Sequence, residues 1–354
     1  MPVFYNYTEN GVAYSFDDVF VPANAFREGN LWSWGLNDNG QLGEDTTTTK
    51  CTPVTTLAGG TNWKQVACGN THTAAIKTDG TLWTWGRNIA GALGNNAFGG
   101  STCTPVTTFA GGTNWKQVAC GSNHTAAIKT DGTLWAWGGG GTYVPVGNNL
   151  QFSVYTPVTT FAGGTNWKQV ACRDSHTAAI KTDGTLWTWG SNAFAQLGDN
   201  TIISRSTPVT TFAGGNDWKQ VACGGSHTAA IKTDGTLWTW GLNGIPGLIG
   251  VGALGDNTII SRSTPVTTFA GGNDWKQVAG GNAHTAAIKT DGTLWTWGLN
   301  DLTAFVPGAF GQLGDNTAIT RSIPVTTFAG GTNWKQVSGG YNHTAATTYI
   351  DSYQ

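Results

Sequence analysis

Residues 63–86 read WKQVACGNTHTAAIKTDGTLWTWG. Close copies of this stretch begin at Trp115, Trp167, Trp218, Trp275 and Trp334, and a Pro-Val-Thr-Thr segment precedes each copy. The prolines of these segments recur at nearly even intervals, at Pro53, Pro105, Pro157, Pro208, Pro265 and Pro324. Self-similarity at a steady period indicates a protein built from stacked repeats, each of which is one supersecondary unit.

Each repeat divides into four short strands. In the first repeat we expect these strands at residues 52–56, 63–68, 72–78 and 82–86. Asp79-Gly80 predicts a tight hairpin turn with positive φ at both central positions, and the period of two places Trp83 and Trp85 on one face of their strand. Four antiparallel strands repeated at this spacing are typical of a β-propeller blade, which buries both faces only when neighbours stack on it.

The two ends of the chain carry complementary parts of a repeat. Trp32-Ser33-Trp34-Gly35 occurs without its three preceding strands, and the last repeat runs to Ile350 without a Trp-x-Trp-Gly segment. We expect residues 31–35 to pair with residues 344–350, because this pairing completes the last blade and removes the exposed edges of the ring. The sequence therefore predicts an all-β fold, a closed six-bladed β-propeller of four-stranded antiparallel blades. In this interpretation residues 27–354 form the propeller and residues 1–26 an N-terminal arm.

The composition excludes several classes of protein. The chain has 354 residues, with 18 Lys and Arg, 20 Asp and Glu and a net charge of −2, so it lacks the cationic face of a nucleic-acid binder. Its 18 Trp, 14 Phe and 8 Tyr can bury too much surface for a disordered chain. No apolar run approaches the roughly 18 residues of a membrane-spanning helix, and no secretory signal is visible.

Several motifs resemble the repeats of the regulator of chromosome condensation (RCC1) family. They are Gly-Gln-Leu-Gly at residues 40–43 and 311–314, the Pro-Val strand, Val-Ala-Cys-Gly-x-x-His-Thr-Ala-Ala and Gly-x-Leu-Trp-x-Trp-Gly. The resemblance covers roughly residues 30–350, departs from the pattern at 141–147, and implies an RCC1-like propeller. It also implies an alternative blade number, because that family usually has seven blades.

The connections that follow the Trp-x-Trp-Gly segments vary in length, whereas the rest of the repeat does not. The connections from Gly241 to Pro265 and from Gly298 to Pro324 are clearly longer than the other four. In a ring such connections lie on one face, and loops on a rigid scaffold are the usual place for binding. Their apolar tips are typical of a recognition surface, although surface loops also tolerate drift. The candidate binding residues are Ile89, Phe98, Tyr143, Val144, Phe152, Phe194, Ile202, Ile245, Leu248, Ile249, Phe305 and Phe310.

The six histidines occupy one position of the repeat, at His72, His124, His176, His227, His284 and His343. Imidazoles related by a ring lie too far apart to share one ion, so we expect each to hydrogen-bond the backbone of its own blade. Asp79 and its equivalents are explained as turn residues. No nucleophilic triad, phosphate-binding loop or acidic pair occurs. The sequence therefore predicts a protein that is not an enzyme, with no catalytic residue, metal or cofactor.

The cysteines admit two interpretations. Cys51 and Cys68 stand at the same sequence spacing as Cys103 and Cys120. If the first two strands of a blade form a hairpin, each pair lies within bridging distance. Two disulfides within blades are typical of a protein outside a reducing compartment. The alternative is buried thiols that act as small apolar side chains.

The segment at residues 14–22, Tyr-Ser-Phe-Asp-Asp-Val-Phe-Val-Pro, resembles the head of propeller-bearing structural proteins of tailed bacteriophages. Tyr14, Phe16, Val19 and Phe20 are its candidate anchoring residues. This resemblance implies a structural protein of a virion (phage tail or fibre) or of another extracellular assembly, located at the virion or extracellular surface. Its variable loops would bind a host-surface receptor, a glycan or a neighbouring subunit, without nucleic acid and without membrane insertion.

Two other functions stay open at this point. The first is an RCC1-like guanine-nucleotide exchange factor or regulatory scaffold, although a basic tail and a charged insertion are both lacking. The second is a propeller lectin with one sugar site per blade, although tryptophan pairs at strand spacing are more typical of packing between blades.

Overall fold

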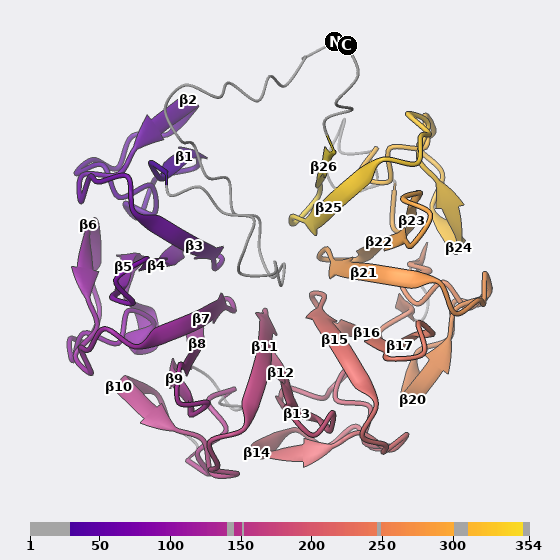
Figure 1. The fold of residues 1–354 in the computed structure, drawn as a ribbon, viewed down its shortest axis with the longest axis horizontal. Coiled ribbons are helices and arrows are strands. Elements are labelled where there is room, and N and C mark those ends of the chain that lie inside the picture. The colour runs from indigo at the N-terminus through magenta and orange to yellow at the C-terminus, as the bar shows by residue number, and fades with distance from the viewer. Residues whose placement is uncertain (1–28, 140–144, 151, 246–248, 301–310, 350–354) are drawn as a thin grey trace.

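The computed structural model of the protein describes residues 29–139, 145–150, 152–245, 249–300 and 311–349. These residues form short antiparallel strands grouped around a central axis (Figure 1). The elements are β1 (Trp32–Gly35), β2 (Lys50–Thr55), β3 (Trp63–Cys68), β4 (His72–Lys77), β5 (Leu82–Arg87), the 3-10 turn η1 (Ile89–Gly91), β6 (Ser101–Thr107), β7 (Trp115–Cys120), β8 (His124–Lys129), β9 (Leu134–Gly138), β10 (Val154–Thr159), β11 (Trp167–Arg173), β12 (His176–Lys181), β13 (Leu186–Gly190), β14 (Arg205–Thr210), β15 (Trp218–Cys223), β16 (His227–Lys232), β17 (Leu237–Gly241), β18 (Gly244–Ile245), β19 (Ile249–Gly250), β20 (Arg262–Thr267), β21 (Trp275–Gly280), β22 (His284–Lys289), β23 (Leu294–Gly298), β24 (Arg321–Thr326), β25 (Trp334–Gly339) and β26 (Thr344–Thr348).

Five sheets have four strands each and repeat one order. They are β3-β4-β5-β6, β7-β8-β9-β10, β11-β12-β13-β14, β15-β16-β17-β20 and β21-β22-β23-β24. In each sheet the strand that begins with tryptophan lies nearest the axis, and the strand that contains the proline lies at the periphery (Figure 1). The prediction of an all-β chain built from repeated four-stranded antiparallel blades is confirmed.

The strands lie where expected, but they group into blades differently. The sequence predicts the Pro-Val strand as the first strand of its blade. In the structure it is the last strand of the preceding sheet, where Val106 of β6 lies opposite Thr84 of β5. Pro105 has no N–H to donate, so an outermost strand accommodates it at little cost. The variable connections therefore join the third and fourth strands of one blade, and not two neighbouring blades.

The turn between the second and third strands of a sheet also differs in detail from the expectation. Gly80 has a φ of 80°, whereas Asp79 is not among the described residues with positive φ. The Asp79 carboxylate instead accepts hydrogen bonds from the Thr81 amide (2.9 Å) and the Thr81 hydroxyl (2.7 Å). The turn is thus closed by an aspartate side chain, which supports the interpretation of this residue as structural.

The two ends of the chain form half-blades that do not join. Strand β1 pairs with β2, and β26 pairs with β25. Among the described residues, no pairing links β1 to β26, so the expected pairing of residues 31–35 with 344–350 is absent and the ring is open between these sheets (Figure 1). Strand β26 also differs in sequence from its equivalents. Thr347 and Thr348 stand where β4 has Ile76 and Lys77, so β26 lacks the buried isoleucine that anchors this strand elsewhere.

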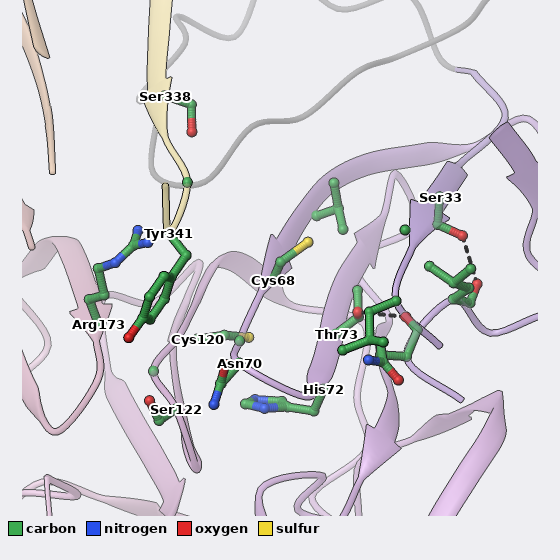
Figure 2. Close-up of a pocket in the computed structure, with 18 of the residues that line it drawn as sticks. Ser33, Cys68, Asn70, His72, Thr73, Cys120, Ser122, Arg173, Ser338 and Tyr341 are labelled. Carbon is green, nitrogen blue, oxygen red and sulfur yellow. Dashed lines mark hydrogen bonds between the residues drawn. The ribbon is translucent and has the colours of Figure 1, made fainter. Parts of the chain in front are cut away.

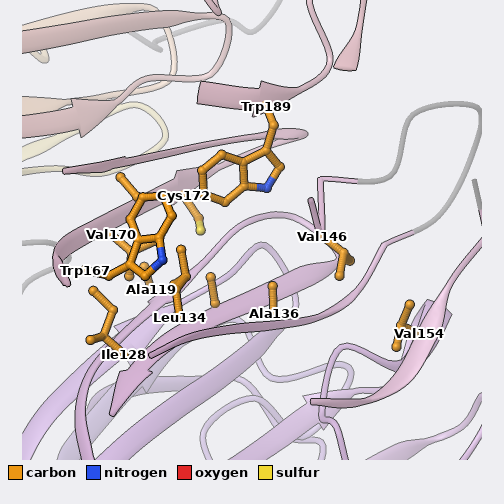
Figure 3. Packing of buried hydrophobic residues seen from close by; sticks show 12 residues of the cluster. Ala119, Ile128, Leu134, Ala136, Val146, Val154, Trp167, Val170, Cys172 and Trp189 are labelled. Atoms are coloured by element: carbon orange, nitrogen blue, oxygen red, sulfur yellow. The ribbon is translucent and has the colours of Figure 1, made fainter. Parts of the chain in front are cut away.

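Neighbouring blades bury their apolar faces against each other. Ile128 and Leu134 of the second complete sheet pack with Trp167, Val170 and Trp189 of the third (Figure 3). The Trp189 ring meets the Trp167 ring edge-on, with centroids 6.3 Å apart. Burying a large apolar side chain contributes about 1.5–3 kcal/mol, and an edge-on aromatic pair adds about 0.5–1.5 kcal/mol. The ring pair lies within one sheet, whereas the contacts of Ile128 and Leu134 with it lie between two sheets, so each blade depends on its neighbours.

A glutamine side chain links each inner strand to the next. The Gln65 amide nitrogen donates to the Val118 carbonyl (3.1 Å), and its oxygen accepts from the Val118 amide (3.0 Å). The same two bonds recur between Gln117 and Val170, Gln169 and Val221, and Gln220 and Val278. A side chain thus pairs with the backbone of the next blade like a short piece of β-ladder, which fixes the blade spacing.

Candidate functional site

One face of the ring carries both the inner turns and the variable connections. The Arg87 amide, at the end of β5, donates to the Thr71 carbonyl in the turn between β3 and β4 (2.8 Å). The Asn88 amide donates to the Gly100 carbonyl just before β6 (3.0 Å). These bonds place the first-to-second strand turns and the third-to-fourth strand connections at the same end of the blade. We call this end the connection face.

A buried asparagine organises five of these connections, whereas the connection between β9 and β10 has Gly140 at this position. The Asn192 side-chain oxygen accepts from the Leu197 amide (2.9 Å), and its nitrogen donates to Asp199 Oδ1 (3.1 Å) and to the Thr201 carbonyl (3.0 Å). Asn37, Asn88, Asn243 and Asn300 bind in the same way in their own connections. These residues were not predicted from the sequence, although an asparagine recurs two positions after the Trp-x-Trp-Gly glycine.

The longer connections keep this arrangement. Asn192 binds a leucine five positions further along the chain, whereas the separations are 11 for Asn243 and Leu254 and 13 for Asn300 and Leu313. The bond from the leucine amide to the asparagine oxygen is therefore kept in the longer connections. The short hairpin β18-β19 is part of the first of these insertions.

Ion pairs fix the outer arms of several connections. Arg205 contacts Asp199 at 2.9 Å, and Arg262–Asp256 and Arg321–Asp315 are equivalent pairs. Burial opposes ionisation of Asp199, but hydrogen bonds from Thr201 and Arg205 and the arginine charge outweigh it and lower the pKa of this carboxyl. The pairs neutralise the charge of the connections, so the surface above them is apolar.

Several predicted binding residues are exposed along the outer arms. Phe98, Phe152 and Ile202 are 78%, 63% and 70% exposed, and Phe194 is 43% exposed. Ile89 lies half-buried in η1. Further exposed apolar side chains occur at the same positions of neighbouring blades. Together they form what we call the apolar rim: Phe98, Leu150, Phe152, Ile202, Ile203, Ile259, Ile260 and Ile319.

Several of these connections contact the outer strand of the next blade. The Asn200 amide donates to the Ser263 carbonyl, and the Asn257 amide to the Ser322 carbonyl, both at 2.9 Å. The Phe98 ring meets the Tyr155 ring of the next blade edge-on at 5.4 Å. Five of the rim residues were not predicted from the sequence, although the repeated Asn-Thr-Ile-Ile-Ser-Arg-Ser at 200–206 and 257–263 marks three of those five.

Several predicted residues lie outside the described residues or only partly within them. Outside are the candidate binding residues Tyr143, Val144, Leu248, Phe305 and Phe310 and the candidate anchoring residues Tyr14, Phe16, Val19 and Phe20. The backbones of Ile245 and Ile249 pair with each other in β18-β19.

The histidines bind the neighbouring blade, and not the backbone of their own blade as predicted. His72 Nε2 lies 2.9 Å from Thr125 Oγ1, and four equivalent contacts follow around the ring. The Thr125 hydroxyl donates its proton to the Ala92 carbonyl (2.9 Å), so His72 must donate from Nε2. Burial lowers the pKa of His72 to about 4. The described residues contain no group of three or more His, Cys, Asp or Glu placed to hold a metal ion.

A cavity of about 550 Å³ extends from the gap between the half-blades, lined by Ser33 and Ala345, to the inner turns at the mouth of the central channel (Figure 2). Its lining includes Cys68, Asn70, Ser122, Arg173 and Tyr341. Arg173 Nη1 donates across the channel to the carbonyls of Gly339 (2.9 Å) and Gly280 (3.2 Å). The neighbouring Asp174 accepts from the Ser122 hydroxyl (3.1 Å), and burial raises the pKa of its carboxyl.

The geometry contradicts the predicted disulfides. Cys51 lies on β2, an outermost strand, whereas Cys68 ends β3 at the axis. Strand β2 pairs with β1 and not with β3, so the hairpin that would bring the two sulfurs together does not exist. Cys103 on β6 and Cys120 on β7 are separated in the same way. All six cysteines lie in the described part of the chain, and none is disulfide-bonded.

Within the described part of the chain, no helix has the length and apolar character needed to cross a bilayer.

Comparison with known proteins defines the relationship of this fold. The chain is 32% identical over 297 residues to the ultraviolet-B receptor UVR8 of Arabidopsis thaliana, covering 83% of this chain and 64% of that protein. It is 30% identical over 305 residues to the mitochondrial RCC1 domain-containing protein RUG3 of the same plant, covering 79% of this chain and 64% of that protein. The chain thus spans about 64% of the length of these curated relatives. The crystal structure of Prp20p from Saccharomyces cerevisiae, described with its binding to Gsp1p and histones, superposes with a TM-score of 0.72 at 18% identity. It covers 97% of this chain and 83% of that one.

These findings correct the predicted biological context. The predictions of a virion or extracellular structural protein, of virion subunits, host receptors or glycans as partners, and of a virion or extracellular location are wrong. The relatives are a plant photoreceptor, a mitochondrial protein and a yeast protein with cellular partners. The nine-residue segment that resembles phage proteins is short, whereas the similarity to cellular proteins extends over the whole propeller.

A family model described as the RCC1-like domain matches residues 25–346. This match covers most of the chain, and the radial arrangement of four-stranded antiparallel blades agrees with it. The protein therefore belongs to the RCC1-like domain family of β-propellers.

Proposed function

We propose that the protein is a non-enzymatic regulatory scaffold of the RCC1-like type, and that it binds a protein partner through its connection face. The observation that carries this proposal is the apolar rim, a row of exposed side chains on five successive connections, four of which are held by buried asparagines. Apolar and aromatic side chains displayed on a rigid support lose little conformational freedom when they bind.

The rim has the chemistry of a protein-binding surface. Ile202, Ile203, Ile259 and Ile260 are each more than half exposed, and the arginines beneath them are paired with aspartates. The centre of a protein interface is typically depleted of charge and filled with large apolar groups. The first connection has four threonines, residues 46–49, at this position, so the rim ends there and has a defined extent.

A GTPase is the first class of partner to test. Membership of the RCC1-like family supports guanine-nucleotide exchange as one form of this regulatory role, and the binding of Prp20p to Gsp1p and histones supports a protein ligand. An exchange factor accelerates nucleotide release from its partner, whereas a passive scaffold binds without this effect.

The test compares two double variants in the full-length chain. We expect Ile202→Asp/Ile259→Asp to lose partners that the unmodified protein captures, because charges placed in the rim have no counter-charge. The matched control is Phe212→Asp/Phe269→Asp in the loops at the opposite end of the blades, which exchanges side chains of similar exposure. Capture is quantified by mass spectrometry, and a panel of small GTPases loaded with fluorescent GDP reports exchange. Equal capture by both variants would contradict the role of the rim.

We also propose that the complete ring has six blades, closed when β26 pairs with β1. Equivalent strands β4 and β5 pair with Ala74 opposite Thr84, and the same register sets Ala345 opposite Ser33. Two-stranded sheets are marginally stable, and their unpaired edges can pair with other chains. Pairing β26 with β1 would replace both two-stranded sheets by one four-stranded blade and would remove both edges. The family match begins at residue 25, which supports a propeller over 27–354 and an arm over 1–26.

A further inference from the structure

Two of the positions where the repeats differ from one another meet at the channel mouth. In the turn between the first and second strands, five repeats have glycine where the third has Arg173. One position earlier, four repeats have cysteine, whereas the last two have Gly280 and Gly339. These are the two residues whose carbonyls Arg173 reaches across the channel. The unusual residues at these two positions therefore meet in space. We infer from this that they act together.

The two glycines allow the inner strands to approach closely. A Cβ on Gly280 would lie 2.6 Å from the Cys223 carbonyl oxygen, and a Cβ on Gly339 would lie 2.6 Å from the Gly281 amide nitrogen. Larger residues would therefore separate the last inner strands. The two carbonyls converge on one guanidinium nitrogen, Nη1, and hold the arginine in a fixed position.

The other guanidinium nitrogens remain available for a ligand. Arg173 Nε and Nη2 make no hydrogen bond with any described residue, and neither is a buried atom that lacks a partner. Arg173 lines the cavity at the channel mouth beside Tyr341 (Figure 2). Within the described residues, no carboxylate forms an ion pair with Arg173. Among the described residues, Nε and Nη2 of Arg173 are therefore donors without a hydrogen-bond partner in the lining of this cavity.

We propose that the channel mouth is a carboxylate-binding site, in which Arg173 receives an acidic side chain or a chain terminus of a partner protein. The planar guanidinium edge matches the two oxygens of a carboxylate, and the bonds of Nη1 to the Gly339 and Gly280 carbonyls hold that edge in place. A single arginine beside Asp174 suits a monoanion better than a dianionic phosphate. This proposal depends on the proposed function in one respect only, which is that the bound carboxylate comes from a partner protein.

The test uses a synthetic probe rather than the unknown partner. A fluorescein-labelled Gly-Gly-Glu-Glu-Glu-Glu peptide with an amidated C-terminus is titrated with the full-length protein, and anisotropy reports binding. We expect Arg173→Gln to weaken binding by at least about tenfold, because charge-assisted hydrogen bonds are lost. Arg87→Gln removes an exposed arginine from the same face and is expected to bind as the unmodified protein does. The matching glutamine peptide is expected not to bind.

Two further arms complete the experiment. A Gly-Gly-Ala-Ala-Ala-Ala peptide with a free C-terminus distinguishes a terminal carboxylate from acidic side chains. Thermal unfolding checks that Arg173→Gln folds. If it does not, Arg173→Lys, which keeps the charge but not the fork, is expected to bind the glutamate peptide several-fold more weakly. Equal binding by folded Arg173 variants and the unmodified protein, or no binding by the unmodified protein, would overturn the site. Neither result affects the rim test, so the two proposals fail separately.

Discussion

At the scale of single residues, a buried histidine and a threonine join each pair of neighbouring blades. The threonine hydroxyl donates to a carbonyl of the preceding connection and accepts from histidine Nε2, which fixes the neutral tautomer. Nδ1 of His72, His124 and His176 is buried without a partner. Five of the six repeats have glycine close to the imidazole, and a Cβ on Gly121 would lie 2.0 Å from His124 Cε1; the third repeat has Arg173 at this position. These histidines therefore hold neighbouring blades together, and this contact depends on the imidazole staying neutral.

The free energy of unfolding should fall steeply with acidification. Burial lowers the pKa of His72 to about 4 and that of His124 to about 3, against 6.5 in an unfolded chain. Between these values the unfolded chain binds more protons, so stability is complete above pH 6.5 and is lost as the pH falls toward 4. Each such histidine lowers the free energy of unfolding by about 2 kcal/mol between pH 6.5 and pH 5. Urea unfolding at pH 7, 6 and 5 measures this effect.

The control for this prediction is Asn123→Gln, which changes an exposed, non-titrating side chain next to His124. We expect Asn123→Gln to leave the pH dependence unchanged and His124→Gln to reduce its slope by about one proton. A stability that stays constant between pH 7 and pH 5 would show that the buried imidazoles are not neutral.

At the scale of elements, five connections have an inner arm fixed by asparagine, and the outer arms of the last five connections carry the apolar rim. The asparagine satisfies backbone groups at both ends of the connection, which is why insertions between Asn243 and Leu254 leave the rest unchanged. The buried core of the blade and the surface of the connection are therefore independent, and the connection can change its sequence without cost to the fold.

Removing one such asparagine should loosen a single connection. Asn192→Ala leaves the Leu197 amide and the Thr201 carbonyl without their partner, so we expect a loss of about 1–3 kcal/mol in the free energy of unfolding. Hydrogen exchange at residues 192–204 should rise while exchange in β15 and β16 does not. Asn123→Ala, at an exposed turn position on the same face, serves as the control. Uniformly faster exchange across the blades would contradict this independence.

At the scale of the whole molecule, five complete sheets are linked by one repeated interface and the two half-blades stand at the open ends. The histidine–threonine contact occurs at each of five interfaces, ending with His284 and Thr344. In the closed six-bladed ring, His343 would reach Thr73 in the same way. Closure would thus extend an existing interface, and would not create a new kind of contact.

A designed disulfide tests closure. In the proposed register Ser33 faces Ala345, so Ser33→Cys/Ala345→Cys should form a disulfide within one chain under mild oxidation. Mass spectrometry without reduction should then find the two peptides joined in a monomer. Each single variant serves as a control for links to native cysteines. A link between two chains would indicate strand exchange, and its absence would favour a ring that needs a further blade.

The sequence by itself determined the repeat, the positions of its strands, the antiparallel blade and the tryptophan core, because strand period, turn residues and burial are local properties of each copy. Trp83 and Trp85 were expected on one face, and both contact Trp63. The position of the Pro-Val strand at the outer edge of its sheet was also indicated by a local feature, because Pro105 lacks an N–H group and is accommodated in an edge strand.

Only the tertiary structure decided which blade each strand joins, that His72 binds Thr125 of the following repeat, and that Arg173 reaches Gly339 across the channel. It also separated Cys51 from Cys68, which sequence spacing had brought together. These relationships depend on how near-identical sheets stack around an axis. Because every copy offers the same local pattern, only their positions in space distinguish one partner from another.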